Sequence, residues 1–252
     1  MKTLRPIKKN QGIATAYDLK FQDILNDMIK DYLIDIGYIY QMNPPTLPES
    51  FNNIEKAVKE KKDKWDELIW AFILANTVNF VAKTYKATDR SLQNALTESG
   101  WHVALQETPE ISRLVKILVK DNVDLVKSVV NEFQDKAGLA VTRNFVLDRT
   151  KDQLQEDIQR LIPKTLARAG LVVRDQSNKI NNVIQKARFT QLGITRVMWD
   201  HGGAYRKEPR PTHEASTGVV FNLSEGCLID GEYIQPGEKI GCKCVYRAVL
   251  PF

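Results

Sequence analysis

The fold is decided near the C-terminus by four short motifs: Arg210-Pro211-Thr212-His213, Gly218-Val219-Val220-Phe221, Pro236-Gly237 and Cys242-Lys243-Cys244. The third cysteine of the chain, Cys227, and one of its three histidines lie in the same segment. A chain that keeps its soft metal ligands within about thirty residues of one another brings them together in space. We therefore expect a small, tightly folded C-terminal module.

The cysteines of this module are candidate metal ligands. Cys242 and Cys244 are two residues apart in a segment that resembles a β-strand, which predicts that both side chains leave the same face. Two thiolates on one face can bind one ion, and Cys227 and His213 would complete a Cys₃His zinc site of the structural type. The alternative has no metal: the cysteines are small buried apolar groups, and His213 is a hydrogen-bonded core histidine.

Length and composition bound the class of protein. The chain has 252 residues, of which 43% are hydrophobic and 27% charged, so it can bury a core without disulfides. Three cysteines, an odd number, indicate a reducing compartment such as a cytoplasm. The basic N-terminus lacks the apolar segment of a secretory signal, and the apolar run 68–81 is too short to cross a bilayer. The sequence therefore predicts no association with a membrane.

Positive charge is concentrated in residues 160–210, which contain eleven basic and three acidic residues, although the net charge of the whole chain is only +5. Such an excess suits a polyanion, either nucleic acid or an acidic protein surface, but it is also common on solvated helices. The candidate nucleic-acid contacts are Lys164, Arg168, Lys179, Lys186, Arg188, Arg206 and Lys207.

Hydrophobic spacing predicts a mainly helical chain with a small β-containing end, an α+β fold. The expected helices cover about 14–33, 53–86, 108–136, 148–162 and 177–193, with Gly138 ending the third, Pro163 following the fourth, and Ser177 and Gly193 bounding the fifth. The expected strands cover 195–199, 219–221, 232–234 and 242–250. This division predicts a flexible basic arm at 1–12, a helical region at 13–145, and a module at 146–252 with helices to 193 and strands over 194–252.

An enzymatic role is the competing interpretation. His213 would need a partner carboxylate and a nucleophile or a metal-bound water, and no nearby acidic residue has a recognised catalytic spacing. The sequence also contains no phosphate-binding glycine loop, no H-E-x-x-H and no G-x-S-x-G. A metal-dependent nuclease that uses the His213 and cysteine cluster is the enzyme that these residues leave open.

The last ninety or so residues, from about Arg160, resemble the phage head-morphogenesis proteins typified by the minor head protein F of phage Mu, which include SPP1-type minor capsid proteins. The resemblance depends on the order and spacing of Gly193, Trp199, Arg210, His213, Gly218, Val220, Phe221, Pro236, Gly237, Cys242 and Cys244. Two features depart from the pattern: Lys243 stands where the family usually has Arg, and Cys227 lies outside the pattern.

The resemblance implies a low-copy, non-enzymatic protein of the virion interior. Such a protein associates with the portal and other capsid proteins during head assembly in the host cytoplasm, and acts in DNA packaging, retention or ejection. A basic helical face suits this place, because contacts to the phosphates of packaged double-stranded DNA are sequence-independent and sensitive to salt. The resemblance also implies a variable helical N-terminal region, for which we expect the portal contacts.

Overall fold

The computed structural model describes residues 2–46, 49–202 and 210–251, which form two compact units. The mixed unit comprises residues 1–15, 80–120 and 173–252, and the helical unit comprises 16–79 and 121–172. Each unit takes segments from both sides of the boundary expected near residue 145. Within the described ranges, no helix has the length and apolar character needed to cross a membrane.

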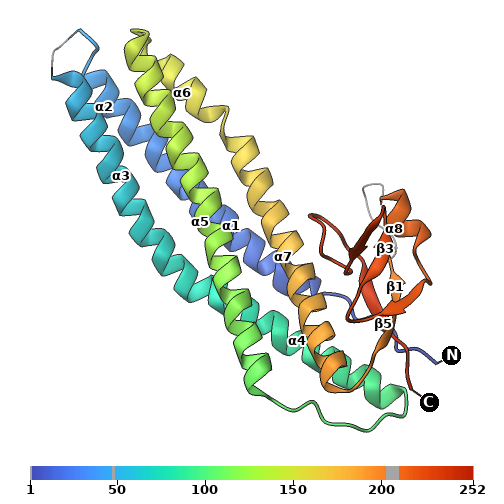
Figure 1. Ribbon diagram of the computed structural model, residues 1–252. Coiled ribbons are helices and arrows are strands. Elements are labelled where there is room, and N and C mark those ends of the chain that lie inside the picture. The colour runs from blue at the N-terminus through green and yellow to red at the C-terminus, as the bar shows by residue number, and fades with distance from the viewer. Residues whose placement is uncertain (1, 47–48, 203–209, 252) are drawn as a thin grey trace. The chain divides into compact units, whose positions relative to one another are not determined.

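The helical unit consists of long helices joined by short connections (Figure 1). Its elements are most of α1 (Gln11–Asp31), the π-helix η1 (Tyr32–Ile36), α2 (Gly37–Met42), α3 (Ser50–Phe72), the π-helix η2 (Ile73–Thr77), the second part of α5 (Pro109–Val146), α6 (Lys151–Gln159) and the start of α7 (Ile162–Gln191). Together with the short strands near the C-terminus, these helices confirm the predicted mainly helical body followed by a small β-containing module.

Several helix boundaries differ from the prediction. The helix expected at 53–86 continues through η2 into α4 (Val78–Glu98). Gly138 does not end α5, because its backbone stays helical. The position does not require glycine either, since an added Cβ would lie 3.6 Å from Val58, an ordinary contact distance. Ser177 caps no helix: it lies inside α7 and donates its hydroxyl to the carbonyl of Val173 at 2.7 Å. Gly193 does follow the end of α7, with a φ of +70°.

Aromatic rings and one partly buried carboxylate organise the helical unit. The rings of Phe21 and Phe72 stack at 5.8 Å, and those of Tyr32 and Phe133 meet edge to face at 5.4 Å. A carboxylate oxygen of Asp31 accepts hydrogen bonds from the indole of Trp65 at 2.6 Å and from the ammonium groups of Lys61 and Lys64. Burial raises the pKa of Asp31, but these donors outweigh it and lower the pKa to about 2.

The mixed unit contains two small antiparallel sheets beside the second part of α7 (Figure 1). The first sheet has the order β2-β1-β5, from β1 (Arg196–Asp200), β2 (Val220–Asn222) and β5 (Val245–Ala248). The second is a hairpin of β3 (Cys227–Ile229) and β4 (Glu232–Ile234). Its loop residues Asp230 and Gly231 have φ values of +54° and +79°, as a two-residue turn between twisted strands requires.

The N-terminal segment is packed, so the expectation of a flexible arm at residues 1–12 is wrong. Thr3 forms an antiparallel bridge with Val249, and the amide of Leu4 donates to the carbonyl of Ala248 at 2.9 Å. Leu4 and Ile7 are 2% and 1% exposed, because both side chains enter the core of the mixed unit. The prediction considered only the basic residues of this segment and overlooked the two apolar side chains, whose burial holds the segment in place.

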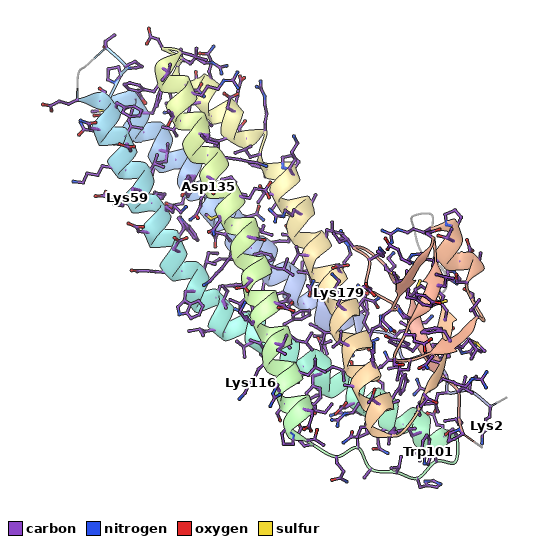
Figure 2. All side chains as sticks on the ribbon, in the orientation of Figure 1. Lys2, Lys59, Trp101, Lys116, Asp135 and Lys179 are labelled. Carbon is purple, nitrogen blue, oxygen red and sulfur yellow. The ribbon has the colours of Figure 1, made fainter. Side chains whose placement is uncertain are left out.

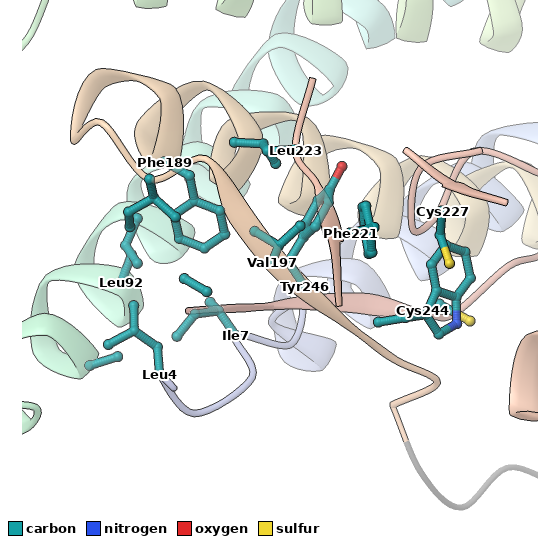
Figure 3. Packing of buried hydrophobic residues seen from close by; sticks show 14 of the residues in the cluster. Leu4, Ile7, Leu92, Phe189, Val197, Phe221, Leu223, Cys227, Cys244 and Tyr246 are labelled. Atoms are coloured by element: carbon teal, nitrogen blue, oxygen red, sulfur yellow. The ribbon is translucent and has the colours of Figure 1, made fainter. Parts of the chain in front are cut away.

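One hydrophobic cluster joins the N-terminal segment, α4, the end of α7 and the sheets of the mixed unit (Figure 3). Trp199 and Tyr246 face each other across β1 and β5, and Phe221 packs between their rings at 6.3 and 6.4 Å. All three cysteines belong to this cluster. The core of the mixed unit is therefore continuous with the place where the candidate metal ligands lie.

Candidate metal centre and its surroundings

The structure brings His213, Cys242 and Cys244 together, as the sequence predicts. The sulfur atoms of Cys242 and Cys244 lie 3.4 and 3.6 Å from Nδ1 of His213. The three ligand atoms lie within 4.8 Å of one another, and each of the three residues is 4% exposed. Two thiols and one imidazole in this arrangement can hold a metal ion.

Trp199 and Arg210 fix the position of His213. His213 belongs to α8 (Pro211–Ala215), a single turn that begins after Arg210 with a proline at its first position. The indole nitrogen of Trp199 donates to the carbonyl of His213 at 3.0 Å, and the two rings meet edge to face at 5.3 Å. The Arg210 guanidinium donates to the carbonyl of Ile240 at 2.9 Å, which connects the start of α8 to the segment before Cys242. These contacts hold α8, and with it His213, against β1 and against the segment that precedes Cys242.

Gly218 and Phe221 complete this support on the other edge of β1. The amide of Gly218, at a φ of +90°, donates to the carbonyl of Trp199 at 2.9 Å, and Val219 accepts the return bond at the same distance. Gly218 therefore turns the chain from α8 back to β1, a conformation that favours glycine. Phe221 then pairs with Val197 in the sheet and contacts the Trp199 ring.

The cysteines do not lie in a strand, so the predicted reason for their proximity is wrong. β5 begins at Val245, and residues 242–244 form an irregular segment after Gly241. Side-chain amides hold this segment. Asn178 donates to the carbonyls of Cys242 and Cys244 at 2.8 and 3.3 Å, and Asn182 donates to that of Cys244 at 2.9 Å.

These asparagines belong to an amide ladder, which we define as Asn178, Asn181, Asn182 and Gln185 on α7. Each is at most 3% exposed. Asn181 and Gln185 both donate to the carbonyl of Ile7, at 2.9 and 3.0 Å. The ladder therefore satisfies backbone carbonyls of both the N-terminal segment and the cysteine segment. Sequence reasoning missed it, although four amides at helical spacing within one helix are a readable signal.

Cys227 is separate from the cluster in ligand geometry. It is 1% exposed, and burial raises the pKa of its thiol, but among the described residues the group of mutually close ligand atoms contains only His213, Cys242 and Cys244. Figure 3 shows Cys227 and Cys244 at the same end of the hydrophobic cluster. The four-ligand set predicted from sequence is therefore reduced to three residues.

The two thiols of the cluster differ in acidity. A hydrogen bond from Cys244, with further bonds from backbone amides and the charge of His213, lowers the pKa of the Cys242 thiol despite burial. The same hydrogen bond, together with burial, raises the pKa of Cys244. A thiolate at Cys242 is the form that binds a metal, and an arriving cation would also favour the loss of the second proton.

In the Pro236-Gly237 motif, the backbone at Gly237 lies directly against the side-chain amides of Asn178 and Asn182. Gly237 has a φ of +80°, and a Cβ there would lie 2.4 Å from Nδ2 of Asn182 and 3.1 Å from that of Asn178. A side chain at this position would therefore displace the amides that hold the cysteine segment.

We expect Gly237→Ala to lower the free energy of unfolding of the protein by about 2–4 kcal/mol, from left-handed backbone strain and the loss of a buried hydrogen bond. Gly231→Ala is the matched control, because Gly231 has a φ of +79° and open space around an added Cβ. It should cost only the backbone strain, about 1–2 kcal/mol. Denaturant unfolding measures both, and equal losses would show that the amide contact is unimportant.

The predicted nucleic-acid contacts have different environments. Lys164 is exposed at the start of α7, and Lys186 is half-buried, with a pKa lowered by burial. Lys179 pairs with Asp175 at 3.0 Å, and Arg168 pairs with Glu132 and donates to Ser128. The remaining two candidates, Arg206 and Lys207, lie outside the described residues.

Arg188 is an internal structural residue, so its predicted contact with phosphate is wrong. Its side chain is 1% exposed. The guanidinium donates to both carboxylate oxygens of Asp89, to the hydroxyl of Tyr85 at 2.8 Å, and to the carbonyl of Gln106. Its structural partner Asp89 could not be identified by counting charges, since the two residues are 99 positions apart in the sequence.

Comparison with known proteins gives one informative match. Over 197 residues the chain is 29% identical to an uncharacterized protein of Haemophilus influenzae, and the match covers 77% of this chain. The chain spans 42% of the length of that protein. No protein-family profile matches the chain, and no solved structure matches it.

Proposed function

We propose that this chain is a minor head protein of a tailed phage or prophage, which binds the portal and acts in head assembly and in DNA packaging, retention or ejection. One observation supports the proposal above the others. The residues that carry the resemblance to the head-morphogenesis proteins contact or support one another around the buried group of His213, Cys242 and Cys244; they are Trp199, Arg210, His213, Gly218, Phe221, Gly237, Cys242 and Cys244. A chance resemblance of scattered short motifs has no reason to converge in this way.

Within this function we propose that His213, Cys242 and Cys244 bind a structural zinc ion. Two thiolates and one imidazole are ligands that zinc prefers, and a small module with short strands gains most from such a cross-link. The burial of all three ligands favours a structural ion over one that exchanges substrate. Three protein ligands are also the number in catalytic zinc sites, so a metal-dependent nuclease is the competing function. Cleavage of DNA that a chelator abolishes and zinc restores would support the nuclease.

The portal contact is proposed for the helical unit. Trp70 and Leu74 are 47% and 56% exposed and lie one turn apart on α3 and η2, where Lys127 covers one side of the Trp70 ring at 4.6 Å. Exposed aromatic residues of this kind are frequent anchors in protein interfaces. Trp65, by contrast, is 5% exposed and serves the core through Asp31.

The test is coexpression of the full chain with the portal protein encoded in the same genome, followed by capture of tagged portal. We expect wild-type chain to be retained, and the variant Trp70→Ala, Leu74→Ala to bind about tenfold more weakly or worse, because aromatic anchors dominate interface energies. Tyr38→Ala is the control, since Tyr38 is 61% exposed on α2 of the same unit. Absence of wild-type retention would contradict the proposed function, and an equal loss with Tyr38→Ala would contradict the choice of face.

A further inference from the structure

One side of α4 carries three cations and no carboxylate. Lys83, Lys86 and Arg90 are exposed and follow one another at intervals of three and four residues, which places them on one side of the helix. The next positions at this spacing are Asn94 and Thr97, which are also exposed. At a rise of about 1.5 Å per residue, the three cations extend over about 10.5 Å of helix. We call these five residues the basic face of α4.

Both acidic residues of α4 are paired with cations from other parts of the mixed unit. Asp89 pairs with the buried guanidinium of Arg188, and Glu98 accepts a hydrogen bond from Arg5 at 2.8 Å. Among the residues that the structure describes, no side chain forms an ion pair or a hydrogen bond with a cation of the basic face. The basic face therefore presents three positive charges without a counterion from the protein.

This arrangement of charges is unfavourable for the free chain. Lys83 and Lys86 are three residues apart, and Lys86 and Arg90 are four apart, so each like-charged pair is adjacent on the helix surface. Like charges at these spacings destabilise a helix by their repulsion. A bound polyanion would remove the repulsion, and the counterions that it releases would favour the complex further.

The composition of the basic face favours phosphate over a protein partner or a membrane surface. Lysine, arginine, asparagine and threonine all donate hydrogen bonds to phosphate oxygens. The five residues include no aromatic or large aliphatic side chain, although protein interfaces depend on such anchors and membrane-surface helices on an apolar face. The large aliphatic and phenylalanine side chains of α4 within the mixed unit are buried instead: Phe80, Val81, Leu92 and Leu96.

We propose that the basic face of α4 binds the phosphate backbone of double-stranded DNA. This inference rests on the proposed function, because it identifies the surface with which the head protein contacts packaged DNA. One strand of B-DNA has a phosphate for about every 3.4 Å of axis, so cations spread over about 10.5 Å match about three phosphates. Contacts of this kind do not distinguish base sequences. None of the three cations belongs to the set predicted from sequence, which considered only residues 160–210.

The experiment compares two triple variants of the full chain that have the same change in net charge. The site variant replaces the cations of the basic face, by Lys83→Gln, Lys86→Gln and Arg90→Gln. The control variant replaces exposed lysines on α1, α3 and α5, two of which are labelled in Figure 2, by Lys30→Gln, Lys59→Gln and Lys116→Gln. DNA affinity is measured by fluorescence anisotropy with two duplexes of unrelated sequence over a range of salt concentrations.

The salt dependence of DNA binding is the decisive quantity. We expect the site variant to bind both duplexes more weakly, with a slope of log K against log salt smaller by about two to three units, as for three lost phosphate contacts. The control variant should keep the wild-type slope. An equal change of slope in the two variants would show that only net charge matters and would overturn the proposal. An unchanged slope in the site variant, or no binding of DNA by wild-type chain at low salt, would overturn it as well.

Thermal unfolding separates a binding surface from a structural role. The three replaced side chains are exposed and repel one another, so the melting temperature of the site variant at low salt should equal or exceed that of wild-type chain. If the triple variant melts lower, the single variants Lys83→Gln and Arg90→Gln decide. Each should reduce the slope by about one unit at the wild-type melting temperature. A slope that falls only together with the melting temperature would overturn the proposal.

Portal capture separates this surface from the function on which it rests. A site variant that loses its DNA slope and is still retained by tagged portal supports both proposals. The same loss of slope without portal retention of wild-type chain supports the DNA surface and contradicts the head-protein function. Portal retention with a DNA slope that does not depend on the basic face contradicts the surface alone. A fluorescent polyglutamate peptide that binds wild-type chain but not the site variant, while both bind DNA equally, would overturn the DNA surface and indicate an acidic protein as the ligand.

Discussion

Replacement of Cys244 by Ser is expected to remove zinc from the protein and to destabilise the mixed unit. Without metal, the buried hydroxyl should lower the free energy of unfolding by about 1–3 kcal/mol. With zinc bound to wild-type chain the difference should be larger, because the binding energy of a structural ion adds to the stability of the fold. Elemental analysis of protein purified without chelator and thermal unfolding with and without chelator measure the two effects.

Cys227→Ser is the matched control for this experiment. Cys227 is buried in the same hydrophobic cluster but is not among the three mutually close ligands. Its replacement should therefore cost a similar amount for the buried hydroxyl and leave the zinc content and the chelator response of wild-type chain intact. Zinc loss in Cys227→Ser would mean that Cys227 is a ligand after all, and wild-type protein without zinc would remove the metal from the proposal.

Asp89→Ala is expected to lower the free energy of unfolding by about 3–5 kcal/mol, because it leaves the buried guanidinium of Arg188 without its carboxylate. The side chain of Arg188 is 1% exposed, so its charge is desolvated in the folded protein and depends on this carboxylate. Denaturant titration measures the change, which should appear as a lower midpoint at a constant slope.

Glu107→Ala tests whether the effect comes from burial. Glu107 lies 3.7 Å from the same guanidinium, but its side chain is 58% exposed, so its removal should cost about 1 kcal/mol or less. The double variant Asp89→Leu, Arg188→Met removes both buried charges and should recover much of the stability lost in Asp89→Ala. Equal losses for Asp89→Ala and Glu107→Ala would show that Arg188 reaches solvent.

The helices were predictable because their cause is local. Apolar residues at helical spacing lie within a few turns of each other, and Gly193 follows α7 as expected. Gly138 misled the prediction, since a glycine in the sequence carries no sign of whether its backbone will leave the helix. The packing of Leu4 and Ile7 was missed for another reason: the strand partner of this segment, near Val249, is almost the whole chain away.

The candidate site was only partly predictable. The proximity of His213, Cys242 and Cys244 follows from their spacing and the surrounding glycines, but the cause is the amide ladder rather than a shared strand face. The sequence could not separate Cys227 from the ligands, because only the distances between ligand atoms in the fold distinguish the three buried thiols. Basic residues pose the same problem, since counting charges treats buried Arg188 and exposed Lys164 alike.

The bridge between Thr3 and Val249 also determines when the chain can fold during synthesis. All segments of the helical unit have left the ribosome soon after residue 172, so this unit can form while translation continues. The mixed unit must wait for β5 and Val249, and until then Leu4 and Ile7 have no sheet to join. A nascent chain therefore exposes its apolar N-terminal segment longest. Slow translation of the codons from about residue 200 to Val249 would prolong the interval in which a chaperone is needed.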